Sequence, residues 1–149
     1  MTQSHKRAIW TLCIWGSVAL AFVVFFFFVG SPDSYANTKP VRIAVGIVFA
    51  IGYLSYAGML YLTRIRSGNP SIIADERDEL IAGKGSNAGM IVVLIYVFLL
   101  AISLWENFQD EGCVPVGWMW WLAYSTTFMA YISSSVAILI LHRRSDDHG

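Results

Sequence analysis

The chain has 149 residues, of which 56% are hydrophobic and only 13% charged, and its formal net charge is zero. An ordinary soluble domain has roughly 25% charged residues, so this composition excludes a soluble globular protein. A net charge of zero also provides no general attraction to nucleic acid, and we expect no direct nucleic-acid partner.

Four long apolar runs contain no Asp, Glu, Lys, Arg or His: 8–29, 43–63, 88–105 and 116–141. A helix that crosses the hydrocarbon core of a bilayer, about 30 Å thick, needs about 18–20 apolar residues, and each run has that length. The runs predict an all-α integral membrane four-helix bundle surrounded by lipid. The segments between them have 13, 24 and 10 residues, which is too short for a further domain, so we expect one four-span membrane domain over 1–149.

The first run exceeds the hydrophobic region of a cleaved secretion signal, which has about 7–15 residues, and we interpret it as a retained anchor. The second run carries Gly46, Ala50 and Ala57 at helical spacing. Such a stripe of small residues is typical of a surface for close helix packing. The third run ends at Trp105, an aromatic anchor at the membrane interface. Short connections predict that consecutive helices are antiparallel neighbours.

The fourth run carries the densest polar group within the predicted spans, with Ser125, Thr126, Ser133 and Ser134 on one face. This face predicts either the polar path of a channel or carrier, or a packing surface whose hydroxyls bond to neighbouring backbone. Packing is favoured because no charged group accompanies the hydroxyls. His142 follows the run, and we interpret it as a side chain that snorkels or caps the helix end.

Basic residues are distributed unevenly between the two predicted membrane faces. The N-terminus, the 64–87 segment and the C-terminus contain Lys6, Arg7, Arg64, Arg66, Arg77, Lys84, Arg143 and Arg144. The other two connecting segments contain only Lys39 and Arg42. Because basic residues stay on the cytoplasmic side, we expect both termini and the 64–87 segment in the cytoplasm, in a multi-pass protein of the inner (plasma) membrane.

The cytoplasmic 64–87 segment also has helix signals of its own. Pro70 follows Asn69 as a plausible helix start, and Gly83 and Gly85 form a plausible stop or hinge. Ile72, Ile73, Leu80 and Ile81 share one face of the helix between them, which would suit the membrane surface. We therefore expect a short interfacial helix ahead of the third span.

The charges of this segment suggest a partner. Arg77 and Lys84 have no acidic residue three or four positions away, and Asp75 and Glu79 are like charges four apart. These charges are not paired within their own helix, so we expect them either to contact another protein or to form a solvated acidic turn at the helix N-terminus. The predicted contact residues are Asp75, Glu76, Arg77, Asp78 and Lys84.

The same residues resemble a motif of small, uncharacterised bacterial and archaeal four-helix integral membrane proteins, Asp-Glu-Arg-x-x-x-Ile-x-x-Lys before a membrane helix. Asp75, Glu76, Arg77, Ile81 and Lys84 match it, while Gly85 stands where Ala is expected. Proteins of this group are often encoded beside small helix-turn-helix regulators, so the resemblance implies a membrane-bound signalling or sequestering role. It implies no activity, cofactor or site.

No pattern in the sequence indicates a catalytic residue, a metal site or a cofactor. Cys13 and Cys113 are expected near opposite faces of the membrane, too far apart for a disulfide within one chain. We therefore expect a non-enzymatic membrane protein whose cytoplasmic acidic segment docks a regulator or a subunit of a membrane complex. The expected partner is such a protein or further copies of the chain in a homo-oligomer. The alternative is a small oligomeric channel or carrier that uses the hydroxyl-bearing face; a membrane enzyme is the third possibility.

Overall fold

The structure, a computed structural model, describes residues 3–29, 37–66 and 76–146. Every regular element in these ranges is helical, which confirms the all-α prediction. The elements are α1 (Gln3–Val24), the π-helical turn η1 (Phe25–Val29), α2 (Lys39–Arg66), α3 (Glu76–Phe108) and α4 (Val116–Asp146). Four of the described helices are long and apolar enough to cross a membrane, and they contain the four predicted runs.

The helix starts follow from the sequence around them. Pro40 occupies the first turn of α2, where a missing N–H costs nothing, and the Arg42 amide donates to the Thr38 carbonyl at 3.2 Å. Gly112 provides the turn between α3 and α4 with a φ of 69°, a conformation that residues with a side chain rarely adopt. Pro115 then precedes α4, and its carbonyl accepts from the Trp118 amide at 3.0 Å.

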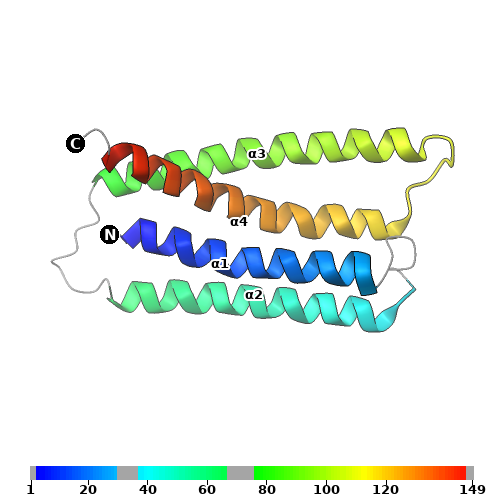
Figure 1. The fold of residues 1–149 in the computed structure, drawn as a ribbon, viewed down its shortest axis with the longest axis horizontal. Helices are drawn as coiled ribbons and strands as arrows, with labels where there is room; N and C mark the ends of the chain where they lie inside the picture. Colours follow the sequence, from blue (N-terminus) through cyan, green and yellow to red (C-terminus); the bar gives the residue numbers. More distant parts are fainter. Residues whose placement is uncertain (1–2, 30–36, 67–75, 147–149) are drawn as a thin grey trace.

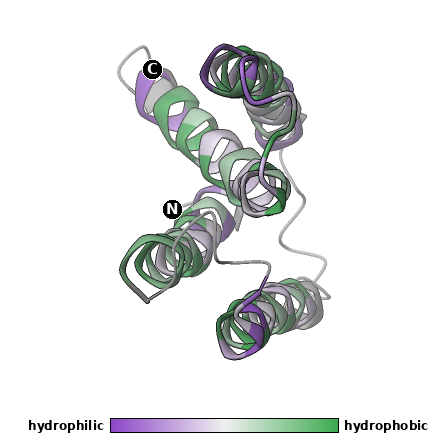
Figure 2. Ribbon diagram, turned by 90° about the vertical axis from the view of Figure 1, so that its right-hand side faces the viewer, coloured by the Kyte–Doolittle hydropathy of each residue, from purple (hydrophilic) through white to green (hydrophobic). Residues whose placement is uncertain are grey.

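The four helices form a row in the order α3, α4, α1, α2, and both chain termini lie at the same end of it (Figure 1). We call this the terminal end and the opposite one the far end. The pairs α1/α2 and α3/α4 are antiparallel neighbours, as expected. However, α2 and α3 make no backbone contact and form the two edges of the row, as the view along the helices also shows (Figure 2).

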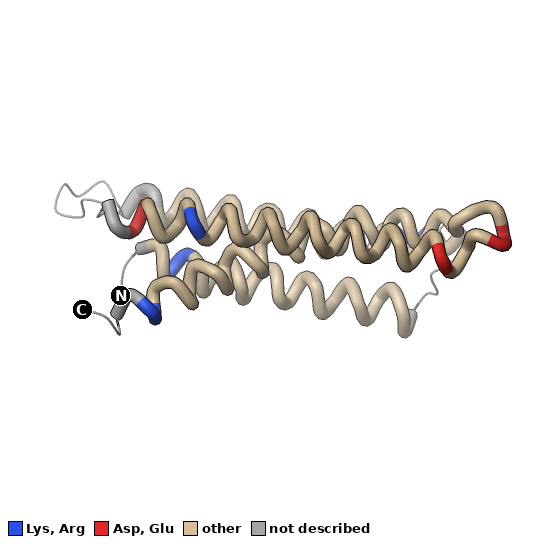
Figure 3. The backbone as a smooth tube through the Cα atoms, turned by 90° about the horizontal axis from the view of Figure 1, so that it is seen from above, with Lys and Arg blue, Asp and Glu red and all other residues tan. Residues whose placement is uncertain are grey.

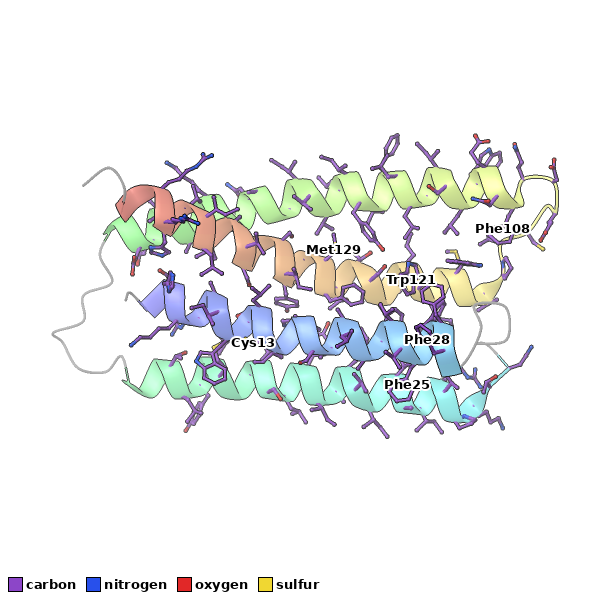
Figure 4. All side chains as sticks on the ribbon, viewed as in Figure 1. Cys13, Phe25, Phe28, Phe108, Trp121 and Met129 are labelled. Carbon is purple, nitrogen blue, oxygen red and sulfur yellow. The ribbon has the colours of Figure 1, made fainter. Side chains whose placement is uncertain are left out.

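Aromatic and β-branched side chains form the core between α1, α2 and α4. The residues of α1 recur every three or four positions, as a single helix face requires. The buried cluster comprises Trp15, Val18, Phe22, Phe26, Val41, Val45, Phe49 and Phe128. Trp121 of α4 lies beside the far end of α1, close to Phe28 in Figure 4, and its ring centroid is 5.0 Å from that of Phe26.

The contact between α1 and α2 does not use the predicted stripe of small residues. Gly46, Ala50 and Ala57 are all exposed in this chain. The close approach is instead at Gly52, where an added Cβ would lie 2.7 Å from a methyl group of Val18. Gly52 is on the same face as Phe49, so the bulky core residues determine which side of α2 meets α1.

Two glycines set the contact between α3 and α4. Gly85 and Gly89 are buried, and an added Cβ at Gly89 would lie 2.9 Å from the Cα of Ser134. An added Cβ at Gly85 would lie 3.1 Å from the backbone nitrogen of Ile138. Small residues four positions apart let membrane helices approach closely, and the glycine pair performs this role here.

The predicted interfacial helix does not stop at Gly83 or Gly85, because α3 runs without interruption from Glu76 to Phe108. Gly85 lies against α4 and does not end the helix. With 33 residues, α3 is about 50 Å long at about 1.5 Å per residue, which exceeds the roughly 30 Å of a hydrocarbon core. Its first turns therefore extend beyond the apolar run at the terminal end.

Candidate functional site

Charged residues of the described ranges lie toward the two ends of the row (Figure 3). Within the described part of the chain, the terminal end has Lys6, Arg7, Asp78, Glu79, Lys84, Arg143 and Arg144. The far end has Lys39, Arg42, Glu106, Asp110 and Glu111. The candidate functional site is the terminal end, because the predicted docking residues and most basic residues lie there.

The predicted docking residues are at or before the start of α3, and the structure describes them unequally. Asp75 lies outside the described residues, and only the backbone is described for Glu76 and Arg77. The Asp78 side chain is turned inward and is 16% exposed, whereas Lys84 is exposed. Asp78 and Lys84 thus face different surroundings on one helix.

Asp78 belongs to a polar cluster that joins three helices. Its carboxylate oxygen lies 3.9 Å from Nε2 of His142 in α4, and the same nitrogen is hydrogen-bonded to the Ser4 hydroxyl of α1 at 2.7 Å. The His5 ring meets the His142 ring edge to face, with 5.5 Å between centroids. The cluster fixes the first turns of α3 against the ends of α1 and α4.

The burial of His142 corrects the prediction for this residue. Its exposed fraction is 6%, so it neither snorkels to water nor simply caps α4. Ser4 is 138 positions away in the sequence, so no local spacing could indicate their contact. The only sequence signal was that His5 and His142 lie next to predicted membrane boundaries.

A second polar contact joins α1 to α2 at this end. Nε of Arg7 donates to the Thr63 hydroxyl at 3.0 Å, and that hydroxyl donates to the Met59 carbonyl at 2.9 Å. The Arg7 guanidinium therefore stays close to the bundle, and the exposed charges at the terminal end belong to other residues.

The outward face of the first turns of α3 is open. Glu79, Leu80, Gly83, Lys84 and Asn87 line a shallow surface hollow of about 580 Å³. Leu80 is 64% exposed although it is large and apolar. No described residue therefore covers this hollow.

The predicted hydroxyl-bearing face of α4 is occupied by hydrogen bonds. Ser125 is fully buried and accepts from the Tyr96 hydroxyl of α3 at 2.6 Å. The Thr126 hydroxyl donates to the Leu122 carbonyl at 2.6 Å. These contacts favour packing over a polar path.

Further along α4, the Ser133 hydroxyl donates to the Met129 carbonyl at 2.6 Å and meets the Gly89 carbonyl of α3 at 3.3 Å. Ser134 packs directly against Gly89. All four predicted residues thus contribute to the α3–α4 contact or bond within α4, and the channel or carrier alternative gains no support from them.

We expect Tyr96→Phe to weaken the α3–α4 contact by about 0.6 kcal/mol, the average for an interhelical hydrogen bond inside a membrane. The ring stays in place while the 2.6 Å bond to Ser125 is lost. Unfolding of the purified protein in detergent measures the effect. In a double-mutant cycle, Ser125→Ala should cost less in the Tyr96→Phe background than alone; equal costs would contradict the bond.

Two further predictions concern cysteines and metals. Cys13 and Cys113 are both free and exposed, as their predicted separation requires. Within the described ranges, no three His, Cys, Asp or Glu side chains are grouped so that they could hold a metal ion. The histidine contacts at the terminal end are the hydrogen bond between His142 and Ser4 and the packing of the His5 and His142 rings.

Comparisons with protein families, curated proteins and solved structures give no match to this chain. The resemblance of the Asp75–Lys84 motif to the uncharacterised membrane proteins thus stays a prediction. The geometry of the terminal end is the basis for a proposed function.

Proposed function

We propose that this chain is a non-enzymatic, multi-pass protein of the inner (plasma) membrane whose first turns of α3 dock a protein partner in the cytoplasm. The supporting observation is that α3 continues past its apolar run without interruption. With the apolar run in the hydrocarbon core, Glu76–Gly85 would extend beyond that core at the terminal end. The concentration of basic residues at this end supports its cytoplasmic location. Both termini are then cytoplasmic as well.

The polar cluster supports this proposal through rigidity. Asp78 and Ser4 hold α3 and α1 to His142 from two sides. A docking element that is already ordered binds with a smaller loss of conformational entropy than a flexible loop. In this proposal Asp75, Glu76, Arg77 and Lys84 contact the partner, while Asp78 positions the first turns of α3.

The expected partner is a protein with a basic or mixed-charge surface, such as a regulator or a subunit of a membrane complex. Acidic residues on a mainly basic cytoplasmic surface are repelled by anionic lipid, which favours a protein over lipid headgroups. The proposal requires no cofactor and no nucleic acid.

Charge reversal at the docking segment tests this proposal. We expect the variant carrying Asp75→Lys and Glu76→Lys to insert normally and to lose a partner that co-purifies with the natural chain in mild detergent. Complementary charges set specificity, so reversing two of them replaces attraction with repulsion. Affinity purification from the native cell with quantitative mass spectrometry measures the loss.

The matched control carries Glu106→Lys and Asp110→Lys, two exposed acidic residues at the far end. It has the same change in net charge and should retain the partner. A partner that stays bound to the Asp75/Glu76 variant, or that is lost equally from both variants, would contradict docking at this segment.

A further inference from the structure

The face of α3 turned away from α4 carries a seven-residue repeat of exposed residues. Leu80, Asn87, Leu94 and Ala101 are seven apart, and Gly83 and Met90 follow the first two by three positions. We call these six residues the outer stripe; all are exposed, and the three largest apolar ones, Leu80, Met90 and Leu94, are each 64% exposed. A repeat at positions a and d of a heptad is the pattern by which one helix packs along another.

Asn87 indicates that the stripe is covered by something other than lipid. It is 18 residues before the interface anchor Trp105, about 27 Å along the helix, which places it at the edge of a hydrocarbon core about 30 Å thick. Its side chain is exposed and has no hydrogen-bond partner among the described residues. An amide facing lipid without a partner is costly, whereas an asparagine at position a commonly pairs with the same asparagine of a second helix.

The charges beside the stripe of one copy are complementary to those beside the stripe of a second copy. Glu79 directly precedes Leu80, at heptad position g, and Lys84 directly follows Gly83, at position e. In a parallel helix pair, a side chain at g meets the side chain five positions later, at e, on the other helix. Five positions separate Glu79 from Lys84, so two copies of α3 related by a two-fold axis along the membrane normal form two Glu–Lys pairs.

The surface hollow has the shape that such a contact requires. Leu80, Gly83, Lys84 and Asn87 of its lining are at positions i, i+3, i+4 and i+7, the four residues that surround a hole in knobs-into-holes packing. No atom lies within 4 Å of a Cβ added at Gly83, so the backbone there is open to a second helix.

We propose that a second copy of this chain docks along the outer stripe of α3 in a parallel two-fold dimer. Asn87 pairs with its counterpart, and Glu79 of each copy pairs with Lys84 of the other. The dimer goes beyond the docking function proposed above and does not depend on it, although it would place two docking segments side by side. Two copies inserted in the same orientation can meet along α3 only in parallel, which is the arrangement that the charge spacing fits.

Cysteine cross-linking tests the geometry. In a chain with Cys13→Ser and Cys113→Ser, we expect Leu94→Cys to give a disulfide-linked dimer on mild oxidation in native membranes. Leu99→Cys is the matched control, since Leu99 is also an exposed leucine of α3, 57% exposed, but lies off the stripe. Dimer from Leu94→Cys with little from Leu99→Cys supports the proposal. Equal yields from both, or no dimer from either, overturn it.

A charge exchange tests the pairing independently. Glu79→Lys alone and Lys84→Glu alone each place like charges opposite one another, so each variant should lose the co-purification of two differently tagged copies. When the two single variants are expressed together, both interchain pairs become complementary again, and co-purification should return. A misfolded chain could not be rescued in this way. Single variants that associate as well as the natural chain, or a mixture that stays dissociated, would overturn the Glu79–Lys84 pairing.

The cross-linking test does not involve the proposed docking residues, whereas the charge exchange alters Lys84, which is one of them. The Leu94 and Leu99 positions lie within the apolar run, far from the acidic segment. Failure of the dimer therefore leaves the docking test with Asp75 and Glu76 unaffected, and failure of docking leaves the cross-linking result unaffected.

Discussion

Gly89→Leu is expected to separate α3 from α4 and to be the most destabilising single change on α3. A Cβ at this position would overlap the Ser134 hydroxyl and would lie 2.9 Å from both the Cα and the backbone nitrogen of Ser134. Overpacking costs typically about 1–3 kcal/mol, and we expect about 3 kcal/mol because the obstructing atoms are backbone and cannot rotate away. Thermal unfolding in mild detergent measures the loss.

The separation should also break hydrogen bonds on either side of Gly89. The Ser133 hydroxyl reaches the Gly89 carbonyl at 3.3 Å, and the Tyr96 hydroxyl donates to Ser125 at 2.6 Å. Both bonds cross between α3 and α4, so a shift of one helix lengthens both. The Tyr96→Phe change should then have a smaller effect in the Gly89→Leu background than in the natural chain.

Gly58→Leu is the matched control for this change. Gly58 is an exposed glycine within α2, and no atom lies within 4 Å of a Cβ added there. The same substitution should therefore be neutral or slightly stabilising, because leucine has the higher helix propensity. Equal losses of stability for Gly58→Leu and Gly89→Leu would show that the close α3–α4 contact does not determine the effect.

The four helices could be predicted because a bilayer requires a minimum length of apolar chain. The start of α3 could not be predicted in the same way. The uncharged run begins at Ala88, whereas the helix begins twelve residues earlier, at Glu76. A helix continues into water without any change in its backbone hydrogen bonds, so charge marks the membrane boundary and not the helix end. The predicted third span and the 76–85 part of the predicted interfacial helix therefore belong to one helix.

The glycines near the start of α3 could either end a helix or pack against another one, and their spacing in the sequence does not decide between these roles. Gly83 and Gly85 resemble a helix stop in water, where glycine commonly follows the last turn. Gly85 and Gly89 are four apart, which is a packing pattern in membranes, and their neighbours on α4 decide between the two interpretations. The same applies to α2, where Gly52 meets α1 and the more regular stripe around Ala50 remains exposed.

The polar cluster at the terminal end was beyond sequence analysis for a different reason. Ser4, Asp78 and His142 belong to three helices, and their contacts join positions with no local periodicity between them. Their meeting follows from the order of helices in the row, with α4 between α1 and α3. A single sequence does not specify that order, since short connections determine only that α1 and α2, and α3 and α4, are neighbours.

Trp15→Ala should be about as destabilising as Gly89→Leu, by about 3 kcal/mol, the lower end of the range for large aromatic residues in cores. Trp15 is fully buried, stacks on Tyr131 of α4 at 4.4 Å, and meets Tyr53 of α2 edge to face at 5.0 Å. It therefore bridges α2 and α4 across α1. The lower end applies because lipid is as apolar as the core, so the cost is lost packing contacts and not exposure to water.

Trp15→Phe keeps an aromatic ring at this position and removes the indole nitrogen, so it tests the two contributions separately. The indole Nε1 is buried and has no hydrogen-bond partner among the described residues, so its removal should sacrifice no bond. A phenyl ring keeps most of the stacking on Tyr131, and we expect Trp15→Phe to lose less than half of what Trp15→Ala loses in the same unfolding measurement. Equal losses for the two variants would contradict stacking on Tyr131 as the source of stability at this position.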